Sequence, residues 1–400
     1  MPTNTTELKQ LHAKLTAWIE QGQLPGAAIL AMQGNTLLDD SCFGHRDVKK
    51  NLMLNTDSLF RLASATKIFT SAAFLTLVDQ ARVQLKDPVA KYLPEYNNLR
   101  TFTGSGDIQA ATKVPTVEDL LRHSNGFAYG DNEPYQSALA AKGLVSVTPA
   151  GLDWSHSLSL REWAYALSEV PMEFEPGADV TYGLGHDLLG AVIETVTGQS
   201  VEAFFTEALV TPLGLKNTFF TVPAHRHADL TNFYSVKNEN LICIEDAADS
   251  PFHTAPGAVS GGGGWDMLGN GGLVSNSRDF SRLLQMIMNR GSLDGVRVLN
   301  PESATLLTRD QTASIGEIFP GNGYSYGLAY SKPLPKKYQD KSFGGYNPGK
   351  MWWGGSTNTH FWFDPKLDFH GIFLTHTFPF RHLDAAETVD RAFYNHQRAE

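Results

Sequence analysis

A serine and a lysine stand three residues apart in the segment RLASATKIFT, residues 61–70. On a helix, Ser64 and Lys67 lie one turn apart on the same face. A serine hydroxyl is a weak nucleophile until a base takes its proton, and a lysine can do so only in its neutral form. The apolar neighbours of Lys67 disfavour its charged form. The pair therefore suggests nucleophilic catalysis, although a packed serine beside a lysine that reaches for solvent has the same spacing.

A tyrosine could share the proton work of this pair. Tyr182 follows a Pro–Gly turn at residues 176–177 and stands just before a predicted helix at 185–198. A side chain at such a place is presented rather than buried, and a phenol near a lysine couples to its protonation. The alternative is a core tyrosine whose hydroxyl has found a partner.

A third segment, WWGGST, lies late in the chain. Two glycines at a strand let the backbone approach a ligand closely, and the backbone N–H groups of Ser356 and Ser64 are candidates for an oxyanion hole. The alternative is a strand with a glycine bulge. The predicted substrate-binding residues near this segment and near Tyr182 are Trp353, Gly354, Gly355 and Leu184.

Elements that could position these residues follow from apolar periodicity and turn residues. We expect a helix at 5–22, a hairpin at 26–44 turning at Gly34–Asn35, and a buried helix from Ser64 onward. Further predicted helices occupy 116–126, 185–198, 200–214, 275–291 (capped by Ser275 or Ser277) and 383–397, and aromatic runs at 324–332, 351–355, 359–365 and 368–378 predict strands.

Strands at both ends of the chain and helices between them predict an α+β fold, with one antiparallel sheet flanked by helices. We expect residues 1–80 and 265–400 to form an α/β domain and residues 81–264 a mostly helical domain inserted into it. The active site is expected in the cleft between the two domains.

Composition narrows the class of protein. The chain has 400 residues, 42% of them hydrophobic, and a net charge of −10. An acidic chain without a basic run has no electrostatic reason to hold nucleic acid or an anionic membrane. We expect no membrane span, no signal peptide and a cytoplasmic location. The two cysteines, Cys42 and Cys243, are expected to be reduced. The sequence leaves open a monomer or a homo-oligomer.

Together, these segments resemble the serine β-lactamase-related superfamily: class C β-lactamases, D,D-peptidases and, closest in motif, family VIII carboxylesterases with related acyltransferases. The resemblance spans most of the chain and matches the family in order and spacing. It implies that Ser64 is the acylated nucleophile, that Lys67 accepts its proton, and that Tyr182 relays protons to and from the leaving group. The segments are SATK, TVEDLLRHSNG, PGADVTYGLGHDLLGAVIETVTGQS, PLGLKNTFF, GNGGLVSNSRDFSRLLQMI and the late WGG.

Two departures from the family pattern bear on the substrate. The second family motif is usually Tyr-x-Asn, whereas Leu184 stands at its third position; the only literal match, at residues 96–98, lacks the Pro–Gly lead-in. The third motif of β-lactamases and peptidases is Lys-[Thr/Ser]-Gly, and here Trp353 takes the place of the cation. Tryptophan offers stacking area and one donor, without charge. Both departures favour a small neutral ester over an anionic β-lactam or peptide terminus.

Other motifs receive a structural interpretation. GYSYG at 323–327 fits the Gly-x-Ser-x-Gly pattern, but that motif needs a strand, a sharp turn and a helix. Ser325 instead stands in an aromatic run that indicates strand on both sides. The histidines are expected to pack or to be exposed, and we expect no metal and no cofactor. The glycine run 261–264 lacks the ending of a phosphate loop. It is interpreted as a loop at the border of the cleft, together with the aromatics Tyr129, Trp265, Tyr324 and Trp352.

The sequence therefore predicts a serine carboxylesterase. The alternatives are an acyltransferase to an alcohol or amine, a β-lactamase or D-stereospecific peptidase, and a binding protein that keeps the penicillin-recognising fold without the activity. An intact Ser64, Lys67 and Tyr182 argue against the last of these.

Overall fold

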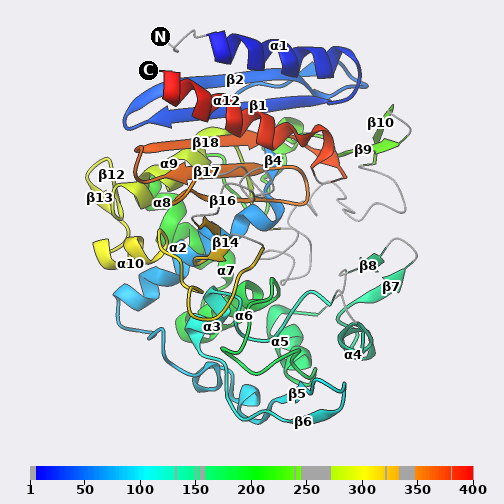
Figure 1. Ribbon diagram of the computed structural model, residues 1–400, viewed down its shortest axis with the longest axis vertical. Coiled ribbons are helices and arrows are strands. Elements are labelled where there is room, and N and C mark those ends of the chain that lie inside the picture. The colour runs from blue at the N-terminus through cyan, green and yellow to red at the C-terminus, as the bar shows by residue number, and fades with distance from the viewer. Residues whose placement is uncertain are drawn as a thin grey trace.

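The core of the molecule is an antiparallel sheet of eight strands built from the two ends of the chain (Figure 1). This computed structural model describes residues 6–130, 133–148, 151–153, 158–237, 240–244, 272–319, 322–332, 347–379 and 381–399. The strand order is β14-β15-β16-β17-β18-β1-β2-β3, so the first strand pairs directly with the last. The strands are β1 (Gly26–Gln33), β2 (Thr36–Asp47), β3 (Leu52–Met53), β14 (Asn322–Tyr324), β15 (Ala329–Ser331), β16 (Met351–Gly354), β17 (His360–Asp364) and β18 (Phe369–Leu374).

Helices cover both faces of this sheet. Successive side chains of a strand point to opposite faces, and Phe361 of β17 packs against Phe280 of α9 (Ser277–Met288), whereas Trp362 packs against Phe393 of α12 (Ala385–Ala399). Helix α1 (Thr6–Glu20) lies beside α12 (Figure 1). The α+β class predicted from the sequence is confirmed.

Helix α2 (Thr66–Asp79) lies on the α9 side of the sheet, where Phe69 packs against Phe280. Every residue from Thr66 to Leu77 is buried. A helix that is apolar all round belongs inside a protein, as the sequence predicted. The short 3-10 turn η1 (Ala63–Ala65) leads directly into α2 and carries Ser64.

The part of the chain between α2 and β9 is rich in short helices and loops, and Figure 1 shows it below the sheet. Its helices are α3 (Val117–Leu121), α4 (Tyr135–Ala141), α5 (Leu160–Ser168), α6 (Gly185–Thr197), α7 (Val201–Phe205) and α8 (Thr211–Leu213), and α10 (Pro301–Leu306) follows α9. Small paired strands accompany them: β4 (Phe60–Arg61) with β11 (Val274–Ser275), β5 (Arg100–Phe102) with β6 (Ile108–Ala110), β7 (Ser146–Thr148) with β8 (Gly151–Asp153), β12 (Ser292–Leu293) with β13 (Val296–Arg297), and β9 (Tyr234–Lys237) between β10 (Asn240–Cys243) and β19 (Thr377–Phe378).

Local signals placed several helix ends correctly. Thr116 forms a capping box with Asp119 at the start of α3, and Ser200 caps α7. Gly198 ends α6 with φ +72°, a conformation that favours glycine. The predicted cap of α9, Ser275 or Ser277, is wrong. The side chain of Asn276 accepts the N–H of Asp279 instead. An asparagine side chain caps as well as serine, so the choice depends on the backbone entering the helix.

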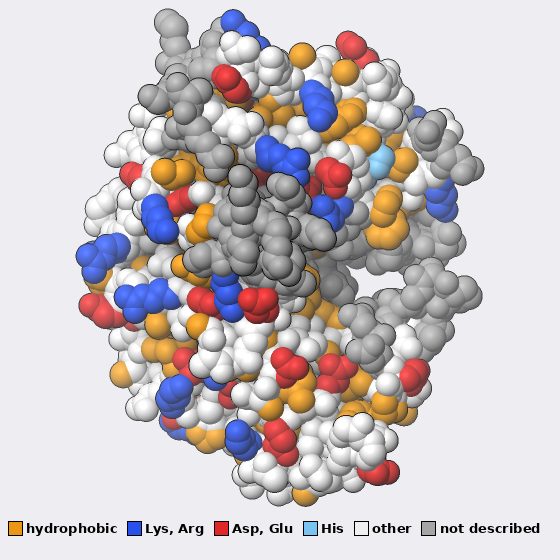
Figure 2. All heavy atoms as spheres, in the orientation of Figure 1, with side chains coloured by type: hydrophobic (Ala, Val, Ile, Leu, Met, Phe, Trp, Pro, Cys, Tyr) orange, Lys and Arg blue, Asp and Glu red, His pale blue; other side chains and the backbone are white. Residues whose placement is uncertain are grey.

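The aromatic run 324–332 is two strands rather than one. β14 ends at Tyr324, β15 begins at Ala329, and Ser325 lies in the turn, where its N–H donates to the carbonyl of Leu328. The predicted domain boundary at residues 264/265 lies outside the described residues. No helix within the described ranges has both the length and the apolarity to cross a membrane. Figure 2 shows acidic and basic side chains interspersed over the visible face.

Candidate active site

Ser64 lies at the point where η1 enters α2, and its side chain is buried. The residue before it, Ala63, adopts φ +45°, in the left-handed region that an alanine occupies only under constraint. Two glycines, Gly272 and Gly355, pack closely against this turn. A Cβ on Gly272 would lie 3.0 Å from the carbonyl oxygen of Ala63, and a Cβ on Gly355 would lie 2.3 Å from that of Leu62. Close backbone packing therefore sets the path of the chain into Ser64.

Lys67 stands one helical turn after Ser64 and is completely buried. Its Nζ donates a hydrogen bond of 3.0 Å to the hydroxyl of Tyr129. The same nitrogen lies 4.8 Å from the ring centroid of Tyr182. The structure thus brings together the predicted base, the predicted proton relay and a second phenol.

Tyr182 stands in the loop before α6, which runs beside residues 127–128. Gly183 makes this close approach possible, because a Cβ there would lie 2.1 Å from the carbonyl oxygen of Phe127. The half-buried phenol of Tyr182 accepts a long hydrogen bond, 3.4 Å, from Nε1 of Trp353. The two rings lie 5.0 Å apart between centroids. Tyr182 is therefore presented toward both Lys67 and the third predicted segment.

The third segment begins on β16 and continues into the turn after it. Gly354 pairs with His360 of β17, and Gly355 lies against Leu62 and Ala63. Thr357 donates to the carbonyl of Arg61 at 3.0 Å and Thr359 to that of Leu62 at 3.1 Å. Two side-chain hydrogen bonds thus join the turn that carries Ser356 to the segment that carries Ser64.

The two expected oxyanion donors are Ser64 and Ser356. Within the described ranges, the N–H groups of these residues donate to no other protein group. An oxyanion hole needs such preorganised donors. The hydrogen bonds of Thr357 and Thr359 fix the two residues relative to each other.

Leu184 lies at the N-cap of α6, with its N–H donated to the carbonyl of Phe127. Its side chain is completely buried in the core. Leu184 is therefore enclosed by other side chains in this structure, and its contact with a substrate stays a prediction. Trp353 is also largely buried, and Gly354 and Ser356 are half-buried.

Sequence reasoning underrated three residues around this site. Tyr129 was named only as a possible cleft residue, yet it contacts Lys67 directly. Phe319 was not singled out, and it stacks on Trp353 with ring centroids 5.7 Å apart and an interplanar angle of 19°. His123 was interpreted as a packed or exposed histidine; it is completely buried, and its ring lies 4.9 Å from that of Tyr182. None of the three belongs to a motif with catalytic spacing.

Two buried histidines lie next to these groups. Burial lowers the pKa of His123 well below its usual value, with smaller contributions from His186 and Lys67. Burial likewise lowers the pKa of His186, with a further contribution from Lys67. Both imidazoles are therefore neutral at physiological pH. Among the described residues, no group of three His, Cys, Asp or Glu side chains is arranged to hold a metal ion.

Ser325 is completely buried, and its hydroxyl donates to the carbonyl of Leu306 at 3.0 Å. Of the other aromatics named above, Tyr324 packs edge-on against Trp353, and Trp352 is buried beside Phe319. The glycine run 261–264 and Trp265 lie outside the described residues.

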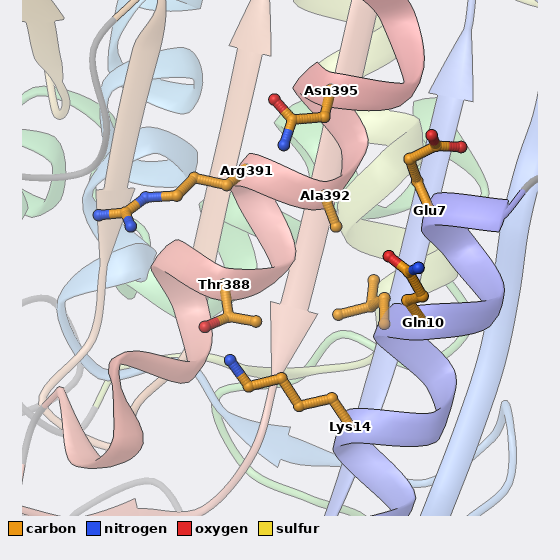
Figure 3. Close-up of a pocket in the computed structure, with 8 residues that line it drawn as sticks. Glu7, Gln10, Lys14, Thr388, Arg391, Ala392 and Asn395 are labelled. Carbon is orange, nitrogen blue, oxygen red and sulfur yellow. The ribbon is translucent and has the colours of Figure 1, made fainter. Parts of the chain in front are cut away.

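A separate hollow of about 270 Å³ lies between α1 and α12, and Figure 3 shows the residues that line it. Lys14 and Arg391 are among its lining residues. It lies on the sheet face opposite α9 and α2, and it contains none of the site residues.

Comparison with known proteins identifies the family. A family model described as "Beta-lactamase" matches residues 8–394. Protein Rv1367c of Mycobacterium tuberculosis is 28% identical, over 92% of this chain and 90% of that protein. Esterase EstB of Burkholderia gladioli is also 28% identical, over 92% of this chain and 91% of EstB. The solved structure of EstCE1, described as a hydrolase with promiscuous acyltransferase activity, superimposes with a TM-score of 0.78 at 21% identity, covering 97% of this chain and 98% of that one.

Proposed function

The chain belongs to the beta-lactamase family, and we propose that within it this protein is a serine carboxylesterase that cleaves small-molecule esters through an acyl-enzyme on Ser64. The observation that carries the proposal is the surroundings of Lys67. This fully buried amine lies one turn after Ser64, 3.0 Å from the hydroxyl of Tyr129 and 4.8 Å from the ring centroid of Tyr182. A lysine kept from water between phenols is suited to exchange protons with a neighbouring hydroxyl.

Acylation follows from this arrangement. Oγ of Ser64 attacks the ester carbonyl carbon while its proton passes to Nζ of Lys67. The carbonyl oxygen becomes an oxyanion that accepts hydrogen bonds from the N–H groups of Ser64 and Ser356. The tetrahedral intermediate collapses, and the bond to the alcohol oxygen breaks. That oxygen takes a proton from Tyr182, which regains one from Lys67.

Deacylation reverses these roles. A water gives one proton to the Lys67–Tyr182 pair as its oxygen attacks the acyl carbon. The second tetrahedral intermediate releases the acid, and Oγ of Ser64 recovers the proton. An alcohol in place of water gives a new ester by the same steps, so hydrolysis and acyl transfer differ only in the acceptor.

The preference for neutral esters has two supports. Trp353 stands beside the phenol of Tyr182, and it stacks under Phe319. This apolar wall carries no charge to pair with a substrate carboxylate, the role that the resemblance gives to lysine in β-lactamases and peptidases. In addition, EstB, a relative over nearly the whole chain, carries the name esterase.

Acyl transfer is the second candidate, supported by relatives named acyltransferases, such as calJ of Penicillium decumbens at 26% identity. Rising concentrations of a primary alcohol during turnover of a p-nitrophenyl ester distinguish the two. An esterase keeps mainly free acid as its product, whereas a transferase shifts to the new ester while nitrophenol release accelerates.

The decisive experiment compares the wild type with Ser64→Ala on p-nitrophenyl butyrate. We expect turnover by the wild type and none above background by the variant, with an unchanged circular dichroism spectrum. Undiminished turnover by Ser64→Ala sinks the assignment. A chromogenic cephalosporin tests β-lactamase activity, and labelling of Ser64 by a fluorophosphonate, followed by mass spectrometry, separates an enzyme from a binding protein.

A further inference from the structure

His123 holds the backbone on both sides of Tyr182. The N–H of Thr181 donates to the carbonyl of His123 at 3.0 Å. The N–H of Gly183 donates to Nδ1 of the same histidine at 3.2 Å. One residue thus binds the N–H groups of the residues immediately before and after the tyrosine, and the centroids of its ring and the phenol ring lie 4.9 Å apart.

We propose that His123 is a positioning residue for Tyr182, and that it holds the phenol toward Lys67 and Trp353 by fixing the N–H groups of the two flanking residues. The inference rests on the proposed function, because it gives Tyr182 the task of moving protons. His123 itself touches neither the substrate nor the reacting atoms in this assignment.

The hydrogen bonds of His123 settle its tautomer. Nδ1 accepts from Gly183, so it carries no proton, and the proton of the neutral ring is on Nε2. Nε2 lies 3.0 Å from the hydroxyl of Tyr324 and donates to it. The ring of Tyr324 packs at 85° against Trp353, with centroids 5.5 Å apart. Through Tyr324, the imidazole therefore connects the loop of Tyr182 with the apolar wall of Trp353 and Phe319.

A protonated imidazole could not do this, because both ring nitrogens would then be donors and Nδ1 would face the N–H of Gly183. Burial is the main reason that the pKa of His123 lies well below its usual value. With both nitrogens engaged and the side chain completely buried, His123 has the properties of a fixed support rather than of an acid or base.

The backbone of His123 is strained, which also indicates that its position is fixed by its surroundings. Its φ is +60°, a left-handed conformation that non-glycine residues adopt seldom, with His and Asn among the more tolerant. This turn directs the carbonyl of His123 to Thr181 and its side chain to Gly183. Strain of this kind persists where the surroundings over-determine it, and it concentrates at functional sites.

His123→Asn and His123→Leu introduce side chains of similar size, and only asparagine can accept the hydrogen bond from Gly183. Asparagine tolerates φ +60° and offers an oxygen where Nδ1 stands, whereas leucine offers none. We expect His123→Leu to lower kcat for p-nitrophenyl butyrate on the order of 100-fold, with KM changed less than about threefold. His123→Asn should keep kcat within about tenfold of the wild type. His370→Leu is the control for loss of stability. It also removes a buried histidine, one that is hydrogen-bonded to Ser281 and lies away from the site.

A double-mutant cycle with Tyr182→Phe tests whether the effect passes through the tyrosine. In the Tyr182→Phe background, His123→Leu should change the remaining rate of Ser64 acylation by a fluorophosphonate less than about threefold. The proposal is overturned if His123→Leu lowers the acylation rate equally in the wild-type and Tyr182→Phe backgrounds. It is also overturned if kcat falls as much in His123→Asn as in His123→Leu. If His123→Leu does not fold, His123→Gln, whose longer side chain places no acceptor at Gly183, takes its place with the same expectation.

The acylation rate also keeps the two proposals apart. A wild type that is labelled at Ser64 but hydrolyses no ester contradicts the proposed function, and the His123 comparison then continues on labelling rates alone. A wild type that hydrolyses esters with undiminished kcat in His123→Leu contradicts only the positioning role.

Discussion

The hydroxyl of Tyr129 lies 3.0 Å from Nζ of Lys67, so two phenols rather than one surround the buried amine. We expect Tyr129→Phe to lower kcat/KM for p-nitrophenyl butyrate about tenfold, the effect of losing one hydrogen bond to an amine that must exchange protons. Steady-state kinetics measure it. Tyr165→Phe, at an exposed tyrosine of α5, should leave the rate unchanged. An unaltered rate in Tyr129→Phe would show that this contact does not orient Lys67.

Gly355 keeps the turn of Ser356 close to the segment of Ser64. An added Cβ would lie 2.3 Å from the carbonyl oxygen of Leu62 and 2.5 Å from the hydroxyl of Thr359, so the two segments would have to separate. Gly355→Ala should therefore lower kcat on the order of 100-fold, as when an oxyanion donor is lost. Gly104→Ala, where an added Cβ meets nothing within 4 Å, is the matched control. Equal activity of the two variants would refute the role of the turn.

Stability should fall in mild acid because of buried histidines. Burial lowers the pKa of His370 from 6.5 to about 4. Between these values the unfolded chain binds a proton that the folded protein does not, so the free energy of unfolding decreases as the pH falls, and this group has no effect above pH 6.5. At pH 5 the loss from His370 amounts to about 2 kcal/mol. Urea unfolding at pH 7.5 and pH 5 should show a smaller difference for His370→Gln than for the wild type; equal differences would contradict the assignment.

Ser325 fits a hydrolase motif in sequence, but its hydroxyl is buried and bound to the carbonyl of Leu306. Ser325→Ala should keep most ester turnover and lose about 1 kcal/mol of stability, the usual contribution of one hydrogen bond. Kinetics and thermal unfolding measure the two effects. Complete loss of turnover with the fold intact would transfer the nucleophile from Ser64 to Ser325.

Features that depend on neighbours in the chain were predictable. The hairpin at Gly34–Asn35, the cap at Ser200 and the glycine end of α6 at Gly198 follow from residues a few positions apart. The buried helix after Ser64 follows from its composition. The sheet and its α+β class needed one more step, the pairing of strands from both ends, which the placement of predicted strands at both ends and helices between them suggested.

Features that depend on distant backbone were not predictable. The contacts of Tyr129 with Lys67 and of Phe319 with Trp353 join loops to elements far away in the chain. Leu184 shares its motif with Tyr182, but the direction of its side chain depends on how the loop meets Phe127. The positive φ of His123 and of Ala63 depends on tertiary packing, which the conformational preferences of these residue types do not predict.

The pairing of β1 with β18 has a consequence for biosynthesis. The hydroxyl of Thr375 donates to the carbonyl of Gly26, 349 residues earlier in the chain. At about 5–20 residues per second, the ribosome delivers this partner roughly 20–70 s after the first strand. Through that interval the apolar edge of β1, whose residues Ala27–Ala31 are all buried in the finished sheet, has no neighbour on that side. Helix α2 is therefore made long before the sheet beneath it can close. We expect the unpaired edge of β1 to be open to contacts with other chains through most of the synthesis.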